Sequence, residues 1–241
     1  MRCKRTWVFL LVFLLSLNSS IPVSAQDTTF SSPSSKTLRQ ELPQKIQANR
    51  ENLQGRIQEL RDELKQKRKE AQELFKEKRE EFKTRLQKIK DVRKKTLVAQ
   101  IDEKISTINK NRADHFLQVL ERLEVILDRI RDKAETAQTN GKDTSNLSSA
   151  IAAAQDAIST AKSAIITQAG KDYVIDASDE AMLKNAVGKT TSQFRKDLRD
   201  THKAVVDAKQ AVRKAASELA KLASAKGINN PVGATRSGGT E

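Results

Sequence analysis

The sequence predicts an all-α protein in which a long basic helix leads into an antiparallel three-helix, coiled-coil-like bundle. The 241 residues include only 8 Gly and 4 Pro, whereas sheet sandwiches, barrels and doubly wound α/β folds need frequent glycine-rich turns. Charged residues make up 32% of the chain and aromatic residues 4%, a composition typical of long helices. In the C-terminal half, apolar residues recur every seven positions, which is the period of packed helices.

Residues 1–25 have the three parts of a secretory signal peptide. A basic start, Met1–Arg5, precedes the apolar run Trp7–Leu17, and the small residues Val23–Ala25 follow. We therefore expect cleavage after Ala25 and a secreted or cell-envelope protein. The apolar run is shorter than the about 20 residues that cross a bilayer, so no transmembrane span is expected in the mature chain. Retention of this segment as an uncleaved anchor is the alternative.

The expected cleavage changes the chemistry of the chain. It removes Arg2, Lys4 and Arg5, which lowers the net charge from +14 to +11, and it removes the only cysteine, Cys3. Disulfides, zinc–thiolate sites and cysteine nucleophiles are then excluded. Helix packing alone must hold the exported chain together.

One uninterrupted helix is expected to follow a disordered, Ser/Thr-rich lead-in over residues 26–42. Leu42–Pro43 marks its start, because proline is tolerated in the first helical turn. From residue 44 to residue 140 there is no proline and a single glycine, Gly55. Nothing local forces a break, although a kink near Gly55 or around residues 109–114 remains open.

Composition divides this helix at about residue 96. Residues 50–95 contain 17 basic and 10 acidic residues, and Lys67 and Lys78 interrupt their narrow apolar stripe. We expect residues 43–96 to project into solvent as a basic helical stalk. Residues 97–139 carry a wider apolar stripe, which indicates burial against two neighbouring helices.

Two further helices complete the predicted bundle of residues 97–226. The first spans residues 145–169, where large Ile and small Ala alternate with a period of seven: Ile151, Ile158, Ile165 beside Ala150, Ala157, Ala164. This pattern favours close approach of a neighbouring helix. After a short extended connection over residues 171–177, the last helix spans residues 179–226, starting from a cap at Ser178. Residues 227–241 are expected to be a disordered tail.

Motifs that could carry chemistry are weak. Gly188-Lys189-Thr190 resembles the end of a phosphate-binding loop, but the preceding glycine is missing and the flanking residues continue a helix. His115 and His202 could bind a metal only together with a carboxylate such as Asp114 or Asp200. No catalytic residue, cofactor or metal is predicted, and the chain is not expected to be an enzyme.

Basic helix faces are the remaining candidate binding surface. Such faces suit an anionic polymer, which they contact through charge, but aromatic residues for base stacking are nearly absent, so sequence-specific nucleic-acid binding is not expected. A solvated surface that only maintains solubility is the alternative. The candidate contacts are Lys65, Lys67, Arg68, Lys69, Lys76, Lys78, Arg79, Arg93, Lys94, Lys95, Arg195, Lys196, Arg199, Lys203, Arg213 and Lys214.

Four segments carry a resemblance to other proteins: residues 82–95, 109–116, 152–158 and 206–215. They resemble uncharacterised exported helical proteins of candidate-phylum bacteria with reduced genomes. The resemblance covers most of residues 40–226 and implies a bacterial envelope or extracellular setting, without an activity.

Two functions follow as expectations. The first is a non-enzymatic exported coiled-coil protein that acts as a spacer, scaffold or interaction protein at the bacterial cell envelope, with a protein partner or self-association through the coiled coil. The second is a module that binds cell-wall polymer, anionic lipid or extracellular DNA through its basic helix faces.

Overall fold

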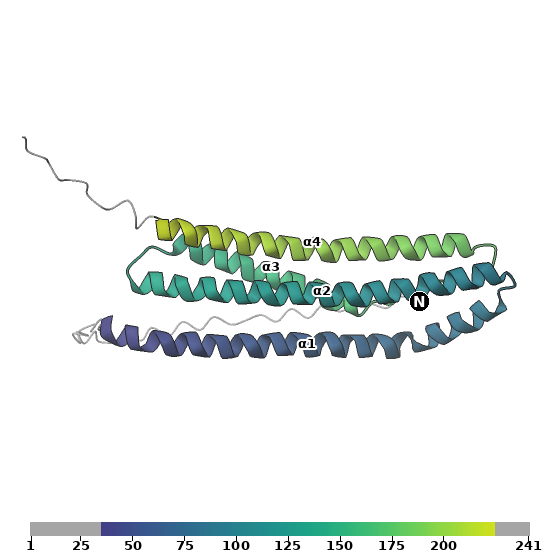
Figure 1. Ribbon diagram of the computed structural model, residues 1–241, viewed down its shortest axis with the longest axis horizontal. Coiled ribbons are helices and arrows are strands. Elements are labelled where there is room, and N and C mark those ends of the chain that lie inside the picture. The colour runs from purple at the N-terminus through teal and green to yellow at the C-terminus, as the bar shows by residue number, and fades with distance from the viewer. Residues whose placement is uncertain (1–34, 225–241) are drawn as a thin grey trace, which may run out of the picture. The chain divides into compact units, whose positions relative to one another are not determined.

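The computed structural model describes residues 35–224, which fold into four helices and contain no strand (Figure 1). The helices are α1 (Ser35–Lys88), α2 (Val92–Thr139), α3 (Ser145–Ala169) and α4 (Leu183–Ser224). The all-α prediction is confirmed. The predicted signal peptide and C-terminal tail lie outside the described residues.

The helices pack side by side in a bundle. Successive helices run in opposite directions (Figure 1), and α2, α3 and α4 contact one another in all three pairs. The first helix, α1, also packs against α2 and α3. The expected projecting stalk is therefore wrong, because Leu60 and Leu64 of α1 are buried in the same core as residues of the other three helices.

A break at residues 89–91 separates α1 from α2 and replaces the single long helix expected from the sequence. Asp91 caps α2, and its Oδ1 accepts hydrogen bonds from the backbone N–H groups of Arg93 (2.9 Å) and Lys94 (3.2 Å). Ile89 is buried in a core cluster with Phe82 and Val98. An aspartate cap and a buried isoleucine can thus form a tight helical hairpin without glycine or proline.

Two predicted helix starts are also corrected. The first helix begins at Ser35, so Pro43 lies inside it, where its ring removes one intrahelical hydrogen bond without ending the helix. The last helix begins at Leu183 instead of following a cap at Ser178. A turn precedes it because Asp179 Oδ1 accepts a hydrogen bond from the Ala181 N–H at 2.8 Å.

The seven-residue period marks the main core. On α3, Ile158 and Ile165 are at most 1% exposed, and the second repeat, Leu147, Ala154 and Ala161, is fully buried. On α4, the buried positions are Leu183, Phe194, Asp197, Thr201, Val205, Ala208, Val212 and Ala215. Phe194, Thr201, Ala208 and Ala215 lie seven residues apart, so the packed face of α4 follows the period predicted for the C-terminal half of the chain.

The segment between α3 and α4 continues the core without being a helix. Tyr173, Ile175 and Ala177 are buried, whereas the residues between them are more exposed. This alternation is typical of an extended chain. Tyr173 also packs edge-on against Phe194, with ring centroids 5.1 Å apart. We call residues 171–182 the connector.

The α3 core gives a first testable prediction. Ala161 is fully buried and Ala152 is exposed, so Ala161→Leu should destabilise the protein by about 1–3 kcal/mol through overpacking. Ala152→Leu should be close to neutral, since leucine is a good helix former. Thermal unfolding of the two variants checks this, and equal melting temperatures would contradict close helix packing at Ala161.

Candidate functional site

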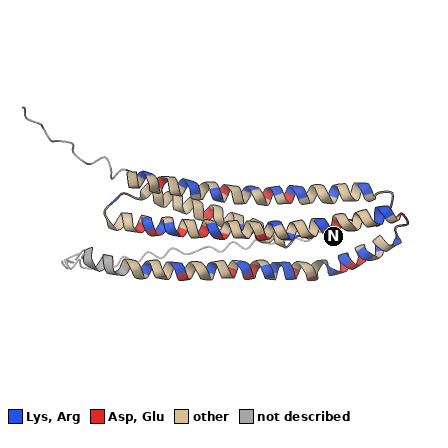
Figure 2. Ribbon diagram, viewed as in Figure 1, with Lys and Arg blue, Asp and Glu red and all other residues tan. Residues whose placement is uncertain are grey.

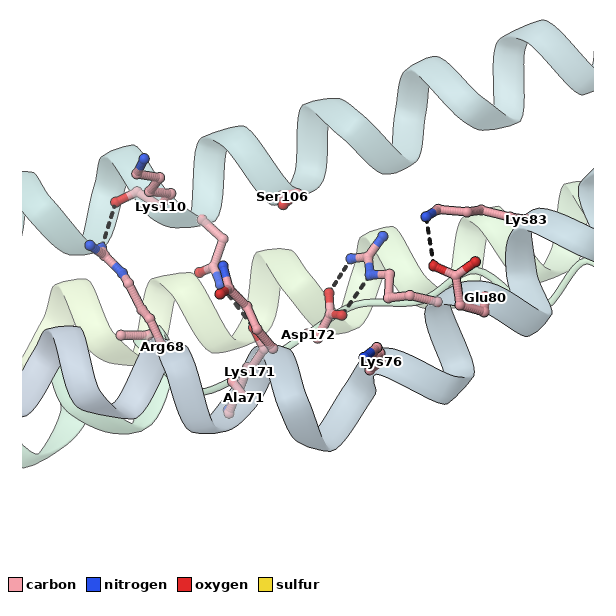
Figure 3. A pocket seen from close by; sticks show the side chains of 13 residues that line it. Arg68, Ala71, Lys76, Glu80, Lys83, Ser106, Lys110, Lys171 and Asp172 are labelled. Atoms are coloured by element: carbon pink, nitrogen blue, oxygen red, sulfur yellow. Dashed lines mark hydrogen bonds and ion pairs between the residues drawn. The ribbon is translucent and has the colours of Figure 1, made fainter.

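A basic groove of about 480 Å³ lies between α1 and α2, beside the end of α3 and the start of the connector (Figure 3). Its lining includes six basic and two acidic side chains: Arg68, Lys76, Arg79, Lys83, Lys110 and Lys171, with Glu80 and Asp172. The stripe Arg68, Gln72, Lys76, Arg79 and Lys83 supplies one wall because these residues recur every three or four positions along α1. Ser106, Asn109 and Lys110 of α2 line the opposite side.

Arg68 and Arg79 occupy positions in the inward-facing seam of α1. Arg68 forms an ion pair with Asp114 of α2 (2.7 Å) and donates to the backbone carbonyl of Lys110 (3.1 Å). Lys67 and Lys78, which the sequence suggested as the interruptions of the seam, are exposed. The stem of Lys67 instead passes over Gly170, where an added Cβ would lie 3.1 Å from the Lys67 Cγ. Glycine at the end of α3 therefore permits this close approach of α1.

Arg79 joins three segments of the chain. Its Nε donates to Asp172 Oδ2 of the connector at 2.6 Å, its second terminal nitrogen contacts Asp172 Oδ1, and its Nη1 donates to Asp102 Oδ2 of α2 at 2.5 Å. The hydrogen bond with Asp172 raises the pKa of Arg79, although burial opposes this shift. For Asp102, burial outweighs the attraction of Arg79 and raises the pKa of the carboxyl group.

A buried polar network lies next to the groove. Gln168 Nε2 donates to Asn109 Oδ1 (2.7 Å) and to the Tyr173 hydroxyl (2.9 Å), which donates to Asp197 Oδ2 (2.9 Å). Burial is the main cause of the raised pKa of Tyr173. Although burial opposes ionisation of Asp197, hydrogen bonds from Lys171 and Tyr173 lower the pKa of its carboxyl group. The network thus joins the C-terminal end of α3 and the start of the connector to α2 and α4.

An acidic stripe on α2 faces the N-terminal half of α1. Burial raises the pKa of Glu124 and of Asp128, with Arg56 acting in the opposite direction on both. Asp128 is only 4% exposed, and Arg131 lies 3.7 Å from it. The negative charge of Asp128 therefore opposes folding at neutral pH.

A pH-dependent effect of Asp128→Asn follows. A carboxyl group with a raised pKa in the folded state favours folding when protonated, and this contribution is lost as the pH rises through the folded pKa. We expect Asp128→Asn to stabilise the protein at pH 7 and to lose this advantage below the ordinary pKa of aspartate, about 3.9. Urea denaturation at both pH values measures the difference. A gain in stability independent of pH would contradict this explanation.

The groove gathers only part of the candidate contact set. It combines Arg68, Lys76 and Arg79 with Lys83, Lys110 and Lys171, which the sequence reading missed. Lys83 continues the spacing of the α1 stripe and could have been found by that signal, whereas no sequence signal connects Lys110 and Lys171 to α1. The remaining candidates on α1, Lys65, Lys67, Lys69 and Lys78, are exposed elsewhere on the helix.

The other candidates lie on α2 and α4, away from the groove lining. Arg93, Lys94 and Lys95 belong to the first turn of α2, where Lys94 pairs with Glu180 at 3.5 Å. The six candidates on α4 are exposed: Arg195, Lys196, Arg199, Lys203, Arg213 and Lys214. Two of them, Lys196 and Lys203, form surface pairs with Asp200 and Asp207.

The two histidines pack against an aromatic ring, and Gly188 lies at an open position of a helix. His115 and His202 flank Phe116, with ring centroids 6.2 Å and 5.8 Å from the phenylalanine ring. Within residues 35–224, no group of three or more potential ligands is placed to hold a metal ion. Gly188 lies within α4, and an added Cβ there would meet open space. None of the four described helices combines the length and apolar character needed to cross a membrane.

In comparisons with known proteins, no family model, curated protein or solved structure matches the chain.

Proposed function

We propose that this protein is a non-enzymatic, exported coiled-coil protein that acts as a spacer, scaffold or interaction protein at the bacterial cell envelope. The main supporting observation is that its interior polar groups tie helices together. Arg79 joins α1, α2 and the connector, and the Gln168–Tyr173–Asp197 network joins α3, the connector and α4. These contacts favour a rigid helical framework that presents its outer faces to partners.

Localisation and cross-linking in the source organism test this proposal. The full chain, with an epitope at its C-terminus, should fractionate with the envelope or the medium and form cross-links to envelope components. A matched variant with Leu11→Arg and Leu14→Arg, which breaks the apolar run of the signal, should remain in the cytoplasm. Retention of the unaltered chain in the cytoplasm would refute an envelope function.

Signal cleavage gives a separate prediction. Intact-mass analysis of the exported protein should show Gln26 as its first residue, because Val23 and Ala25 supply the small side chains that the peptidase requires. Ala25→Arg should block this cleavage and leave the longer chain. Full-length unaltered protein held in the membrane would instead support the uncleaved anchor.

Polyanion binding is a second proposed function, and the outer face of α4 favours it. Arg195, Arg199, Arg213 and Lys214 are exposed, and none forms an ion pair with a carboxylate in the described part of the chain. Basic side chains are distributed along this helix (Figure 2), which packs against α2 and α3 but not against α1 among the described helices. An anionic polymer could therefore follow α4 through charge alone.

Binding to heparin beads separates the two functions. A polyanion-binding protein should be retained at low salt and released as the salt concentration rises. Absence of retention at low salt would refute polyanion binding while leaving the envelope scaffold unaffected.

A further inference from the structure

We propose that the groove between α1 and α2 is a specific binding site for a phosphate-bearing polymer segment, such as the backbone of a phosphodiester polymer. This inference rests on the second proposed function and assigns it to one site. The basic side chains here line one recess of about 480 Å³ and come from α1, α2 and the connector (Figure 3), whereas those of α4 are distributed along an open helix face.

The two arginines provide fixed hydrogen-bond donors. A guanidinium group has five N–H donors. Asp102 and Asp172 use three of those on Arg79, and Asp114 with the Lys110 carbonyl uses two of those on Arg68. Donors therefore remain on both side chains, and the carboxylates that hold the guanidinium groups reduce the ordering needed when a ligand binds.

The lysines provide mobile charge around these fixed groups. Within residues 35–224, the ammonium groups of Lys76 and Lys110 form no ion pair with a carboxylate, while Lys83 forms an exposed pair with Glu80 (2.8 Å). Lys76 and Lys110 lie on opposite walls of the groove, on α1 and α2. Three further carboxylates, Asp102, Asp114 and Asp197, pair with lining cations but are not themselves part of the lining.

The arrangement favours phosphate over carboxylate. A carboxylate is planar and binds best to the paired donors of an arginine, but Asp172 already occupies that paired edge of Arg79. Two donors remain on Arg79 and three on Arg68. Together with the ammonium groups of Lys76 and Lys110 they come from both walls of the groove, which suits the several oxygens of a tetrahedral phosphate. A recessed site also suits a narrow chain better than a flat membrane surface.

Binding of fluorescently labelled short-chain inorganic polyphosphate tests the site by anisotropy at low salt. The variant with Lys76→Glu and Lys110→Glu should bind at least about tenfold more weakly, because one charge-assisted contact contributes more than the free energy of a tenfold change. The control variant, Arg195→Glu with Arg199→Glu, has the same net charge and should lose less affinity. All three proteins should show the same melting temperature, since the four side chains are exposed.

The possible results separate this site from general polyanion binding. Equal losses in both variants, or a larger loss in the α4 variant, would overturn the groove site while leaving polyanion binding intact. No binding of polyphosphate by the unaltered protein would overturn both. A further arm uses vesicles of anionic lipid: if the unaltered protein binds them more tightly than polyphosphate, and the groove variant loses vesicle binding, the ligand is a membrane surface and the polymer assignment is wrong.

Discussion

Replacing Arg79 with methionine should lower the free energy of unfolding by about 2–3 kcal/mol. Removing one partner of a fully buried ion pair typically costs about 3–5 kcal/mol, and the Arg79 side chain retains 23% exposure, which reduces that cost. The substitution leaves Asp102 and Asp172 without their shared cation. Urea denaturation followed by circular dichroism measures the change.

Lys83→Met is the matched control for this prediction. Lys83 lies on the same stripe of α1, but its pair with Glu80 is exposed on both sides, and such pairs contribute about 0–1 kcal/mol. A double variant, Arg79→Met with Asp102→Asn, should lose less stability than the sum of the single variants because the two residues share one interaction. Additive losses, or equal losses for Arg79 and Lys83, would show that Arg79 does not join these segments.

Leu120→Ala should produce a loss of about 2–5 kcal/mol, the usual cost of a cavity in a well-packed core. Leu120 is fully buried in the main core, which it shares with Leu60 of α1 and Leu147 of α3. The midpoint of urea denaturation should fall while its slope stays constant. This combination would indicate a loss of stability without a change in the surface exposed on unfolding.

Leu74→Ala serves as the control for the core prediction. Leu74 is 74% exposed on α1, and substitutions at such surface positions usually change stability by less than about 0.5 kcal/mol. Similar losses at Leu74 and Leu120 would mean that α1 is buried in a way that differs from the packing described above.

The sequence predicts the helical faces better than it predicts how they pair. The sequence marks the buried faces through a seven-residue period, as in Ile158 and Ile165 or Val205 and Val212, which are all buried. This period can be recognised within a single helix, without knowledge of its neighbours. Besides Leu60 and Leu64, the packing of α1 on the bundle uses carboxylates of other segments, Asp102, Asp114 and Asp172, which pair with its arginines. No pattern within α1 reveals those partners, so its charged seam reads as a solvent-exposed face.

The same limit applies to the site and to the helix boundaries. Lys76 and Lys83 lie seven residues apart on α1, and this spacing predicts that they share one face of the helix. Lys110 and Lys171 join the groove only through tertiary packing. The break at residues 89–91 combines a cap at Asp91 with the burial of Ile89. Aspartate is a preferred cap residue, but the burial of Ile89 arises only from tertiary packing.

The extended part of the connector has a consequence for how the chain tolerates insertions and deletions. The 25 residues of α3 advance about 37 Å at 1.5 Å per residue. Residues 171–177 add about 23 Å as extended chain, so that together they nearly match the about 63 Å of the 42-residue α4. An inserted residue in this stretch would turn Tyr173, Ile175 and Ala177 outward or displace their neighbours, as a register slip does in a strand. The loop at residues 140–144 has no such alternation, and we expect natural length variation to accumulate there instead.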